Sequence, residues 1–573
     1  MPELHDVIDR EMREELAAYD DLTAALLHRR GVQTRDEAAA FLAPNYDEHI
    51  HDPLLLKNMP EAAERLRSAI KNGEHIAIWS DYDCDGIPGG VILHDFLKKV
   101  GANFENYIPH RHEEGYGVNV DGIEKLANNG AKLMITVDSG ITDVAAIAHA
   151  KKLGMDVIVT DHHLPQEGKL PDAIIVDHKQ GGETYPFQDL CGAAMAWKLV
   201  CATLAVAPEL REKVPQGWEK WLLDMAGLAT IADMVSLTGE NRVIAHYGLI
   251  VMRKSPRIGL QKLCKVMRVN QRFISEDDVA FMLAPRVNAA SRMGDPRDAF
   301  TLFTTDDEAL AEELAKKLEA ANRGRRAAAA AITRGVHAKM TERMAARNGA
   351  LPSVIALGDP DWKPALLGLV ASSIAEEYER PVFLWGREGN QTLKGSCRSY
   401  GNVHLVELMT AAKDVFAQFG GHAYSGGFTV KSDQVFFLEE QLAKARDASV
   451  HVSVTEQIQA DATLTPDEAT YELMKKLARL APFGEGNPKP VFLFRDVYIS
   501  VVTWFGKSSE HLKLSVATEF SDPIDAVAFY AKRELGKRVE RLESGKRATL
   551  FASLERDQFS RKRVPRLRIV SLG

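Results

Sequence analysis

Four short apolar runs between positions 75 and 179 set the pattern of the first part of the chain. They read HIAIWSD, KLMITVD, DVIVTDHH and AIIVDH, and each is rich in β-branched residues. Such near-continuous apolar runs are typical of parallel strands that are buried on both faces. Helical patterns, for example over residues 143–154, lie between them. The order predicts an α/β domain with a doubly wound parallel sheet built from βαβ units.

All four runs end in Asp or in Asp-His, so acidic and imidazole side chains follow every predicted strand. Ligands of parallel sheets gather beyond the carboxyl ends of the strands, at a topological switch point. The side chains expected at this edge are Asp81, Asp83, Asp85, Asp138, Asp161, His162 and His163. Neutral imidazole among several carboxylates is a donor set for a divalent transition metal, and mixed O and N ligation suits Mn²⁺ better than Mg²⁺.

The segment Asp81–Gly86 also resembles the start of an EF-hand calcium loop. That loop needs a Glu six residues after its Gly, and position 92 is Ile. An EF-hand is therefore disfavoured, while a helix N-cap with a turn stays open as a purely structural alternative.

The pattern changes three times along the rest of the chain. Residues 190–303 look helical, and an apolar helix over 221–235 ends near Asp233. Residues 306–348 are Ala-rich and highly charged, which predicts one long, exposed helix between two domains. A second α/β module follows from residue 351, and after about residue 453 short strands and turns predict a small β-barrel.

Length and composition narrow the class of protein. A chain of 573 residues predicts three to five domains, and 45% hydrophobic with 26% charged residues indicates folded globular domains. Crossing a bilayer takes roughly 18 to 20 apolar residues, and no such stretch is present. The N-terminal MPELHDVIDREMREE is acidic, unlike a signal peptide, so we expect no membrane association and a cytoplasmic location. Five scattered cysteines without a CxxC pair disfavour disulfide and zinc-ribbon frameworks.

The formal net charge is −9, yet the C-terminal segment is basic. Residues 531–573 contain thirteen Lys and Arg against five Asp and Glu. This concentration would suit an anionic partner. A solvated helix face with alternating charges explains it equally well.

Several motifs in a fixed order resemble a known family. They are SDYDCDG, VDSG, TDHH and IADMV, followed by GGH, which together resemble the DHH phosphoesterase superfamily with its DHHA1 second domain. YIPHR, LAPRVNAASRMGD, GSCRS, PFGEGNPKPVF and FGKSSEHLKL extend the resemblance to the bacterial RecJ-type exonucleases, over nearly the whole chain from about residue 50. The combined match is specific, although each fragment alone would be weak.

The resemblance implies a two-metal site that uses Mn²⁺ or Mg²⁺. Its expected ligands are Asp81, Asp83, Asp85, Asp138, His162 and Asp233. Asp138 would bridge the two ions, and the activated water would need no protein nucleophile. The resemblance places Asp83, Asp85 and Asp138 in catalysis together with His163, which would contact the scissile phosphate.

The resemblance also implies contacts to the nucleic acid. Arg111, Ser396 and Arg398 would hold a 5′ phosphate, and Arg286, Asn288 and Arg292 would contact nucleotide or support the site. Gly420, Gly421 and His422 resemble the DHHA1 signature, where backbone and imidazole can approach a phosphate. Surface salt bridges for the arginines, and a Gly-rich turn with a structural histidine, are the alternatives.

The C-terminal segment resembles the family's OB-fold, a barrel that binds single strands through basic grooves and aromatic stacking. Trp504, Lys507 and Lys513 are the residues we expect to bind there, with Phe505 and His511 nearby. The aromatic residues would serve equally well as barrel core.

The five segments expected from this resemblance are listed by residue number. They are a helical segment at 1–50, the DHH catalytic domain at 51–305, the connecting helix at 306–348, the DHHA1 domain at 349–453 and the OB-fold-like domain at 454–573.

The resemblance predicts a metal-dependent 5′→3′ exonuclease that degrades single-stranded DNA to 5′ mononucleotides in repair and recombination. A single-strand-binding protein and a helicase are implied as partners, and we expect a monomer. Two alternatives remain open: a phosphodiesterase of short oligoribonucleotides or cyclic dinucleotides, and an inactive scaffold in a DNA-processing complex. The inactive scaffold is disfavoured because every Asp and His expected of a metal site is present.

Some positions depart from the family pattern. Ser80 stands where relatives usually carry Gly, IPGG follows the DxDG sequence, and DWKPALLG lacks the usual His and Gly. Asp177 and His178 form an additional acid–histidine pair at a strand end, which we interpret as structural or as supporting the metal ligands.

Overall fold

The computed structural model describes residues 4–6, 8–166, 168–388, 392–448, 459–506, 509–557 and 564–573. The chain divides into two units. The first unit consists of residues 6–322 and 471–490, and the second of residues 323–470 and 491–573 together with the start of the chain. The five predicted domain boundaries stay predictions, and the division after Thr470 does not coincide with the one predicted at 454.

The first unit contains the predicted parallel sheet. Its strands are β1 (His75–Ser80), β2 (Asn103–Tyr107), β3 (Leu133–Val137), β4 (Asp156–Thr160) and β5 (Ile174–Val176). They lie in the order β2-β1-β3-β4-β5, and every pairing is parallel. The four apolar runs are β1, β3, β4 and β5, whereas the polar edge strand β2 was not predicted.

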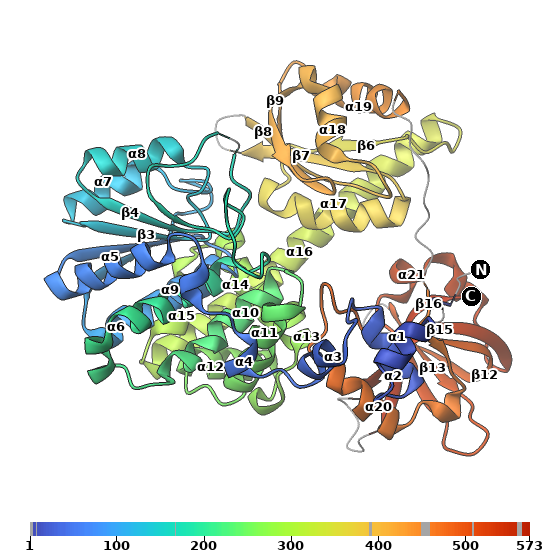
Figure 1. Ribbon diagram of the computed structural model, residues 1–573. Helices are drawn as coiled ribbons and strands as arrows, with labels where there is room; N and C mark the ends of the chain where they lie inside the picture. The colour runs from blue at the N-terminus through green and yellow to red at the C-terminus, as the bar shows by residue number, and fades with distance from the viewer. Residues whose placement is uncertain are drawn as a thin grey trace. The chain divides into compact units, whose positions relative to one another are not determined.

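Helices cover both faces of this sheet (Figure 1). On one face, Trp79 and Met134 pack with apolar residues of α7 (Val120–Asn128) and α8 (Val144–Lys152). On the other, Ile78 and Val137 join a larger core with α5 (Met59–Asn72), α6 (Gly86–Val100) and α9 (Gly192–Val206). Burial on both sides explains why the strands are apolar without alternation.

The remaining helices of the first unit lie before and after the sheet. The N-terminal ones are α1 (Arg10–Glu15), α2 (Asp21–His28), α3 (Arg35–Leu42) and α4 (Tyr46–His49). Those after the sheet are α10 (Leu223–Ala232), α11 (Gly239–Met252), α12 (Ile258–Met267), α13 (Glu276–Asp278), α14 (Ala284–Met293) and α15 (Arg297–Thr304). The predicted helical character of residues 190–303 is confirmed.

The predicted connecting helix is α16 (Glu308–Ala346), a single helix of 39 residues. It begins in the first unit and ends in the second. Its Ala-rich, charged sequence has high helix propensity. The helix is less exposed than predicted, because Leu314, Leu318, Val336 and Met340 are buried.

The second α/β module contains a mixed sheet in the order β6-β7-β8-β10-β9. Its strands are β6 (Ile355–Gly358), β7 (Val382–Glu388), β8 (Thr392–Arg398), β9 (Phe416–Gly421) and β10 (Ser425–Val430). Its helices are α17 (Pro364–Tyr378), α18 (Leu405–Ala411) and α19 (Leu438–Asp447).

The C-terminal segment forms the predicted barrel. Its elements are β11 (Ala462–Thr463), β12 (Phe492–Phe505), β13 (His511–Val516), β14 (Ile524–Ala528), α21 (Ala531–Glu534), β15 (Lys546–Arg556) and β16 (Pro565–Leu572). The order β12-β13-β14-β16-β15 is closed by an additional pairing of β12 with β15. Closure leaves these strands without an open edge.

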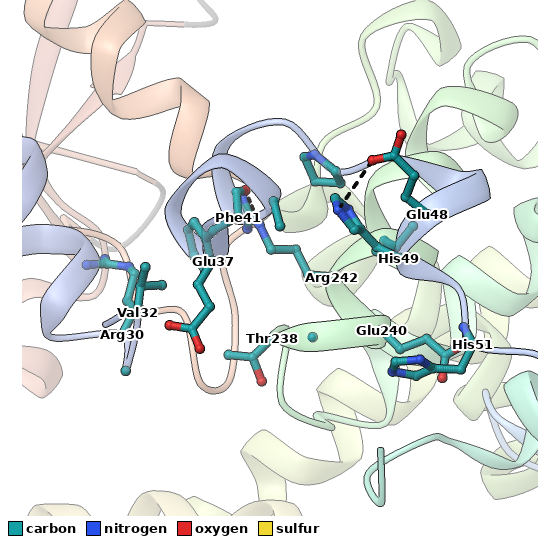
Figure 2. A pocket seen from close by; sticks show the side chains of 15 residues that line it. Arg30, Val32, Glu37, Phe41, Glu48, His49, His51, Thr238, Glu240 and Arg242 are labelled. Atoms are coloured by element: carbon teal, nitrogen blue, oxygen red, sulfur yellow. Dashed lines mark hydrogen bonds and ion pairs between the residues drawn. The ribbon is translucent and has the colours of Figure 1, made fainter. Parts of the chain in front are cut away.

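Residues 471–490, which begin with α20 (Tyr471–Leu477), precede the barrel in sequence but belong to the first unit. Arg242 on α11 is buried and donates to the carbonyls of Leu480 at 2.8 Å, Ala481 at 3.0 Å and Phe41 at 2.7 Å. A cavity of about 350 Å³ lies beside Arg242, between the N-terminal helices and the start of α11 (Figure 2).

Among the described residues, no helix is both long and apolar enough to span a membrane.

Candidate metal centre

The carboxyl ends of three neighbouring strands bring the predicted ligands together. Asp81 follows β1, Asp138 follows β3, and Asp161, His162 and His163 follow β4. Asp233 is the C-cap residue of α10 and reaches the same place from the helical part of the unit. Three overlapping groups could hold a metal ion: Asp138, His162 and His163; Asp85, His162 and Asp233; and Asp81, Asp83 and Asp138. The six predicted ligands therefore converge on one edge of the sheet.

His162 lies at the centre of this cluster. Its Nε2 atom is 3.1 Å from Asp138 Oδ1, 3.5 Å from Asp85 Oδ2 and 3.8 Å from Asp233 Oδ2. Asp138 is shared by two of the three groups, as a bridging ligand would be.

The loop after β1 is shaped by its own carboxylates. Asp83 Oδ1 accepts hydrogen bonds from the backbone N–H groups of Asp85 at 2.8 Å and Gly86 at 3.1 Å. The Cys84 N–H donates to Asn288 Oδ1 at 3.0 Å. A Cβ atom at Gly86 would lie 2.5 Å from the Asp81 carbonyl oxygen, so the turn requires glycine there.

Asp85 is held by the N-terminus of α9. Its two oxygens accept from the Gly192 N–H at 2.6 Å and the Ala193 N–H at 2.7 Å. A helix N-terminus favours negative charge, which fixes this carboxylate in place. A Cβ atom at Gly192 would lie 2.6 Å from Asp138 Cβ. This contact was not predicted from the sequence, in which Gly192 at the start of an apolar helix is the only local signal of it.

The carboxylates of the cluster repel one another. Burial and then neighbouring carboxylates raise the pKa of Asp138 and Asp81, bring that of Asp85 to about 6 and bring that of Asp233 to about 9. Asp81 Oδ1 is buried without a hydrogen-bond partner. Within the described parts of the chain, no Lys or Arg forms an ion pair with these carboxylates. Carboxylates that repel each other in this way fit divalent cations.

The two histidines differ in environment. Burial and then the neighbouring His163 lower the pKa of His162 to about 3, so its imidazole is neutral, as a metal ligand must be. Burial alone would lower the pKa of His163, but a 2.8 Å hydrogen bond from Nδ1 to Asp161 Oδ1 raises it above its usual value. The His163 side chain is 43% exposed, whereas that of His162 is 10% exposed. This difference agrees with the predicted division between a metal ligand and a phosphate contact, which stays a prediction.

The backbone at Asp138 adopts a left-handed conformation with φ of +58°. Non-glycine residues adopt this region at a cost, and such residues cluster at functional sites. The Asp138 N–H still pairs with the Thr160 carbonyl at 3.0 Å, which ties the turn to β4. The strained turn thus places the central carboxylate over the strand ends.

The predicted nucleic-acid contacts of the first unit have different surroundings. Arg111 lies over the Tyr82 ring, with its guanidinium carbon 4.8 Å from the ring centroid. Arg286 is buried and donates to Glu319 at 2.7 Å and to the Met282 carbonyl at 2.7 Å. Its environment therefore suits the supporting role that the sequence left open, as does that of Asn288. The Arg292 carbonyl lies 3.3 Å from His112 Nε2.

Asp177 and His178 at the end of β5 are fully buried, and they belong to none of the three candidate metal groups. Asp177 Oδ1 accepts from the Lys179 N–H at 2.7 Å. Burial first and foremost raises the pKa of Asp177 to about 7 and lowers that of His178 to about 4. Both side chains are therefore suited to being neutral, as expected for a structural pair.

In the second unit, Ser396 and Arg398 lie on β8, and Arg398 Nη1 donates to Ser396 Oγ at 3.1 Å. Gly421 has a φ of +142°, and a Cβ atom there would lie 2.4 Å from the Ser425 carbonyl oxygen, so this hairpin requires glycine. The neighbouring Gly420 has open space around it, and His422 is exposed. Their predicted phosphate contacts stay predictions.

In the barrel, Lys513 pairs with Asp525 at 2.7 Å, which leaves the lysine partly neutralised. Trp504 lies under Lys532, with Nζ 5.5 Å from the ring centroid. Lys507 lies outside the described residues. The predicted binding by these side chains stays a prediction, and the Lys532 contact was not foreseen.

Comparisons with known proteins place this geometry in a family. The chain matches the DHH family N-terminal domain over residues 75–230, the DHHA1 domain over 351–451 and the RecJ OB domain over 460–571. It is 34% identical to the single-stranded-DNA-specific exonuclease RecJ of Bacillus subtilis, covering 96% of this chain and 67% of that protein. It is 30% identical to the Escherichia coli protein of the same name, covering 83% and 84% of the two chains. The chain belongs to the RecJ family.

Solved RecJ structures agree with the fold and with the candidate metal centre. RecJ from Thermus thermophilus in complex with Mn²⁺ matches the whole chain and 79% of that protein, with a TM-score of 0.80 and 26% identity. The same protein in complex with Mg²⁺ matches with a TM-score of 0.74 and 25% identity. The predicted cofactors, Mn²⁺ or Mg²⁺, are thus those of a related RecJ, and the expected RecJ fold is confirmed.

Proposed function

We propose that this protein is a metal-dependent exonuclease that hydrolyses single-stranded DNA from the 5′ end and releases 5′ mononucleotides. The observation that carries the proposal is the convergence of five aspartates and two histidines at one sheet edge in a chain of the RecJ family. The related proteins are named as single-stranded-DNA-specific exonucleases. An inactive scaffold would have no reason to keep this complete and self-repelling cluster.

Asp81, Asp83, Asp85, Asp138, His162 and Asp233 would hold two ions. When bound, Mn²⁺ or Mg²⁺ would neutralise charge on the scissile phosphate and lower the pKa of an attacking water. The carboxylates contribute by fixing the positions of the ions, and the Asp85 contacts with α9 and the turn at Asp138 keep those carboxylates from moving.

His163 would hold the substrate rather than an ion. Its Nδ1 is occupied by Asp161, which leaves Nε2 to face a phosphate oxygen. Asp161 is itself fixed, because its Oδ2 accepts from the Ile141 N–H at 3.0 Å. The raised pKa of His163 favours the protonated ring, which donates a charge-assisted hydrogen bond to the phosphate.

The other predicted contacts would bind the single strand and its 5′ end. Arg111 would contact the 5′ phosphate together with Ser396 and Arg398, while Arg292, Gly420, Gly421 and His422 would contact phosphates or sugars. The barrel would bind the strand further along through Trp504, Lys507 and Lys513. Binding should then weaken steeply as salt is added.

In the cell, we place the enzyme in DNA repair and recombination in the cytoplasm, as a monomer. An enzyme confined to single strands needs a source of them, so a helicase and a single-strand-binding protein are the partners we propose. These assignments rest on the family alone.

The test is degradation of a single-stranded DNA oligonucleotide in Mn²⁺, labelled in turn at each end, with a duplex of the same sequence as control. The wild-type protein should release 5′-end mononucleotide from the single strand only, and Asp138→Ala should abolish the release. Asp172→Ala is the matched control, because Asp172 precedes β5 at the opposite edge of the sheet and is largely exposed. Activity on short oligoribonucleotides or cyclic dinucleotides alone would overturn the proposal in favour of a phosphodiesterase. Inactivity on all these substrates would favour a scaffold.

A further inference from the structure

A pocket of about 770 Å³ lies where α11 ends, between α11, α12 and a short 3₁₀ helix (Gln271–Phe273) of the first unit. The charged side chains that line it are Arg253, Lys254 and Arg272, and the described residues of its lining include no carboxylate. Lys254 and Arg272 are exposed, and Arg253 is half-buried. Because the chain as a whole has more acidic than basic residues, a pocket with cationic charge alone requires an explanation.

The three cations of this pocket have no counter-charge of their own. In the part of the chain that the structure describes, none of them forms an ion pair. Neighbouring cations do: Arg257 pairs with Asp224 at 3.1 Å, and Lys262 pairs with Glu308 at 3.0 Å. The pocket therefore differs from the surface around it, where the protein supplies the matching carboxylates.

Arg253 has the best-defined geometry of the three. Its Nε atom donates to the Ile274 carbonyl at 2.9 Å, and its Nη atoms make no hydrogen bond to any described residue. Burial lowers the pKa of Arg253, and the carboxylate of Glu276 opposes this effect only in part. Glu276 itself accepts from the Phe483 N–H at 3.3 Å. The guanidinium is thus held on one side and partly desolvated, with two donor groups left for an anion.

Capping of α11 does not account for these cations. Basic side chains are common at helix C-termini because they can hydrogen-bond the last carbonyls. Here the amide of Gln271 does so, since its Nε2 atom donates to the carbonyls of Met252 and Ser255, both at 2.9 Å. Gln261 Nε2 also donates to the Ser255 carbonyl, at 3.4 Å. Neutral donors therefore occupy two carbonyls that would otherwise repel an anion.

The pocket is separate from the candidate metal centre. Ser255 belongs to its lining, and the Oγ atom of Ser255 donates to Asp224 near the start of α10. Asp233, the metal ligand, is the C-cap residue at the other end of that helix. At 1.5 Å per residue, the helix from Asp224 to Asp233 is about 14 Å long. An anion in this pocket would therefore not be the scissile phosphate.

We propose that this pocket is a phosphate-binding site distinct from the metal centre. Phosphate oxygens suit it because guanidinium groups bind them through paired hydrogen bonds, and the ammonium of Lys254 adds a further charge. The phosphates of a single-stranded nucleic acid and those of a free small molecule share this chemistry, and the experiment separates the two sources. The proposal goes beyond the proposed function and does not depend on hydrolysis.

The experiment measures binding by the wild type, by the pocket variant Lys254→Gln/Arg272→Gln and by the control variant Lys71→Gln/Arg35→Gln. Each double variant removes one Lys and one Arg that are exposed in the first unit, but only the first pair lines the pocket. Exposed substitutions of this kind usually leave stability nearly unchanged, which circular dichroism checks. The probes are inorganic pyrophosphate and single-stranded DNA of about 20 nucleotides, longer than one barrel binds. A chelator is present throughout, so the DNA is not degraded.

If strand phosphates occupy the pocket, the pocket variant should bind the DNA about ten-fold more weakly at low salt. The slope of log affinity against log salt should also become shallower by about 1.4, because each phosphate contact to a single strand contributes about 0.7. The control variant should stay within about two-fold of the wild type. If the ligand is a free phosphate compound, the pocket variant should instead lose a pyrophosphate site in calorimetry while its DNA binding stays unchanged.

Binding of both probes by the pocket variant as tightly as by the control variant would overturn the inference. Equal weakening of DNA binding in the two variants would overturn it as well, because the loss would then follow from net charge rather than from the pocket. Neither result bears on the proposed function, since no measurement uses the metal ions or the hydrolytic reaction.

Discussion

Two groups of buried carboxylates lie at the two ends of helix α10, and one of them contains its own cation. Near the start of the helix, Asp224 is paired with Arg257 at 3.1 Å, and Arg257 also pairs with Asp95 at 2.9 Å. Ser255 Oγ donates to Asp224 at 2.7 Å. Burial alone would lower the pKa of Arg257, but Asp224 and Asp95 raise it, so this guanidinium stays charged.

At the other end of the same helix, Asp233 faces further carboxylates and the helix C-terminus, which also disfavours negative charge. Its pKa is raised to about 9, first by burial and then by Asp85 and Asp83. The carboxylates near the start of α10 are neutralised by Arg257, and this ion-pair network stabilises the fold. The carboxylates near the end of α10 would be neutralised by bound cations, so they bind metal but destabilise the metal-free protein.

The largest difference between the two ends should appear in activity. Asp233→Asn removes a metal ligand and should lower kcat/KM on the order of 10⁴-fold, which corresponds to about 5.5 kcal/mol of transition-state stabilisation. Asp224→Asn, nine residues earlier on the same helix, should keep activity within about ten-fold per folded molecule. Steady-state kinetics with a single-stranded oligonucleotide measures both, and equal losses would mean that the two ends are not distinct.

Stability should show the reverse order. Arg257→Met leaves the buried Asp224 and the partly buried Asp95 without a counter-charge and should lower the free energy of unfolding by about 3 kcal/mol. Urea unfolding followed by circular dichroism measures the loss, with Lys151→Met, which removes the exposed pair with Asp172, as the control near zero. A loss below about 1 kcal/mol would contradict a structural role for this network.

Metal ions should stabilise the protein through one end of the helix only. Mn²⁺ at a hundred times its dissociation constant should raise the free energy of unfolding by about 2.7 kcal/mol per site in the wild type. Asp138→Asn should lose most of this gain, whereas Arg257→Met should keep it. Thermal unfolding with and without Mn²⁺ checks the expectation, and a gain in Asp138→Asn equal to that of the wild type would place the ions elsewhere.

The last expected effect is the pH dependence of the metal-free protein, for which the direction is the prediction. Asp85 and Asp233 have folded pKa values of about 6 and about 9, above those of unfolded carboxyl groups. The folded state then binds more protons, so the free energy of unfolding should fall as pH rises between about 4 and 9. Urea unfolding with a chelator at pH 5 and pH 8 measures the slope. Asp233→Asn should flatten it, and a slope of opposite sign would be inconsistent with the raised pKa values.

The sheet edge could be predicted from the sequence because strand ends in a βαβ repeat are set by local hydrophobic runs. Asp138 and His162 meet as expected, although 24 positions separate them. The contacts of Asp85 with the start of α9 could not be predicted, because they join segments more than a hundred residues apart. Strand β2 was missed because an edge strand such as NFENY lacks a continuous apolar run. The sequence left two roles open for Arg286, a nucleotide contact or support of the site, and could not show its long-range ion pair with Glu319.

The place of residues 471–490 sets how late in synthesis the first unit can finish folding. The first unit cannot be complete until this segment has been synthesised, after the long helix and the second α/β module. Until then, the buried guanidinium of Arg242 lacks the carbonyls of Leu480 and Ala481. At roughly 5–20 residues per second, nascent chains would carry this unfinished surface for about ten seconds or more, a period in which a chaperone could bind it.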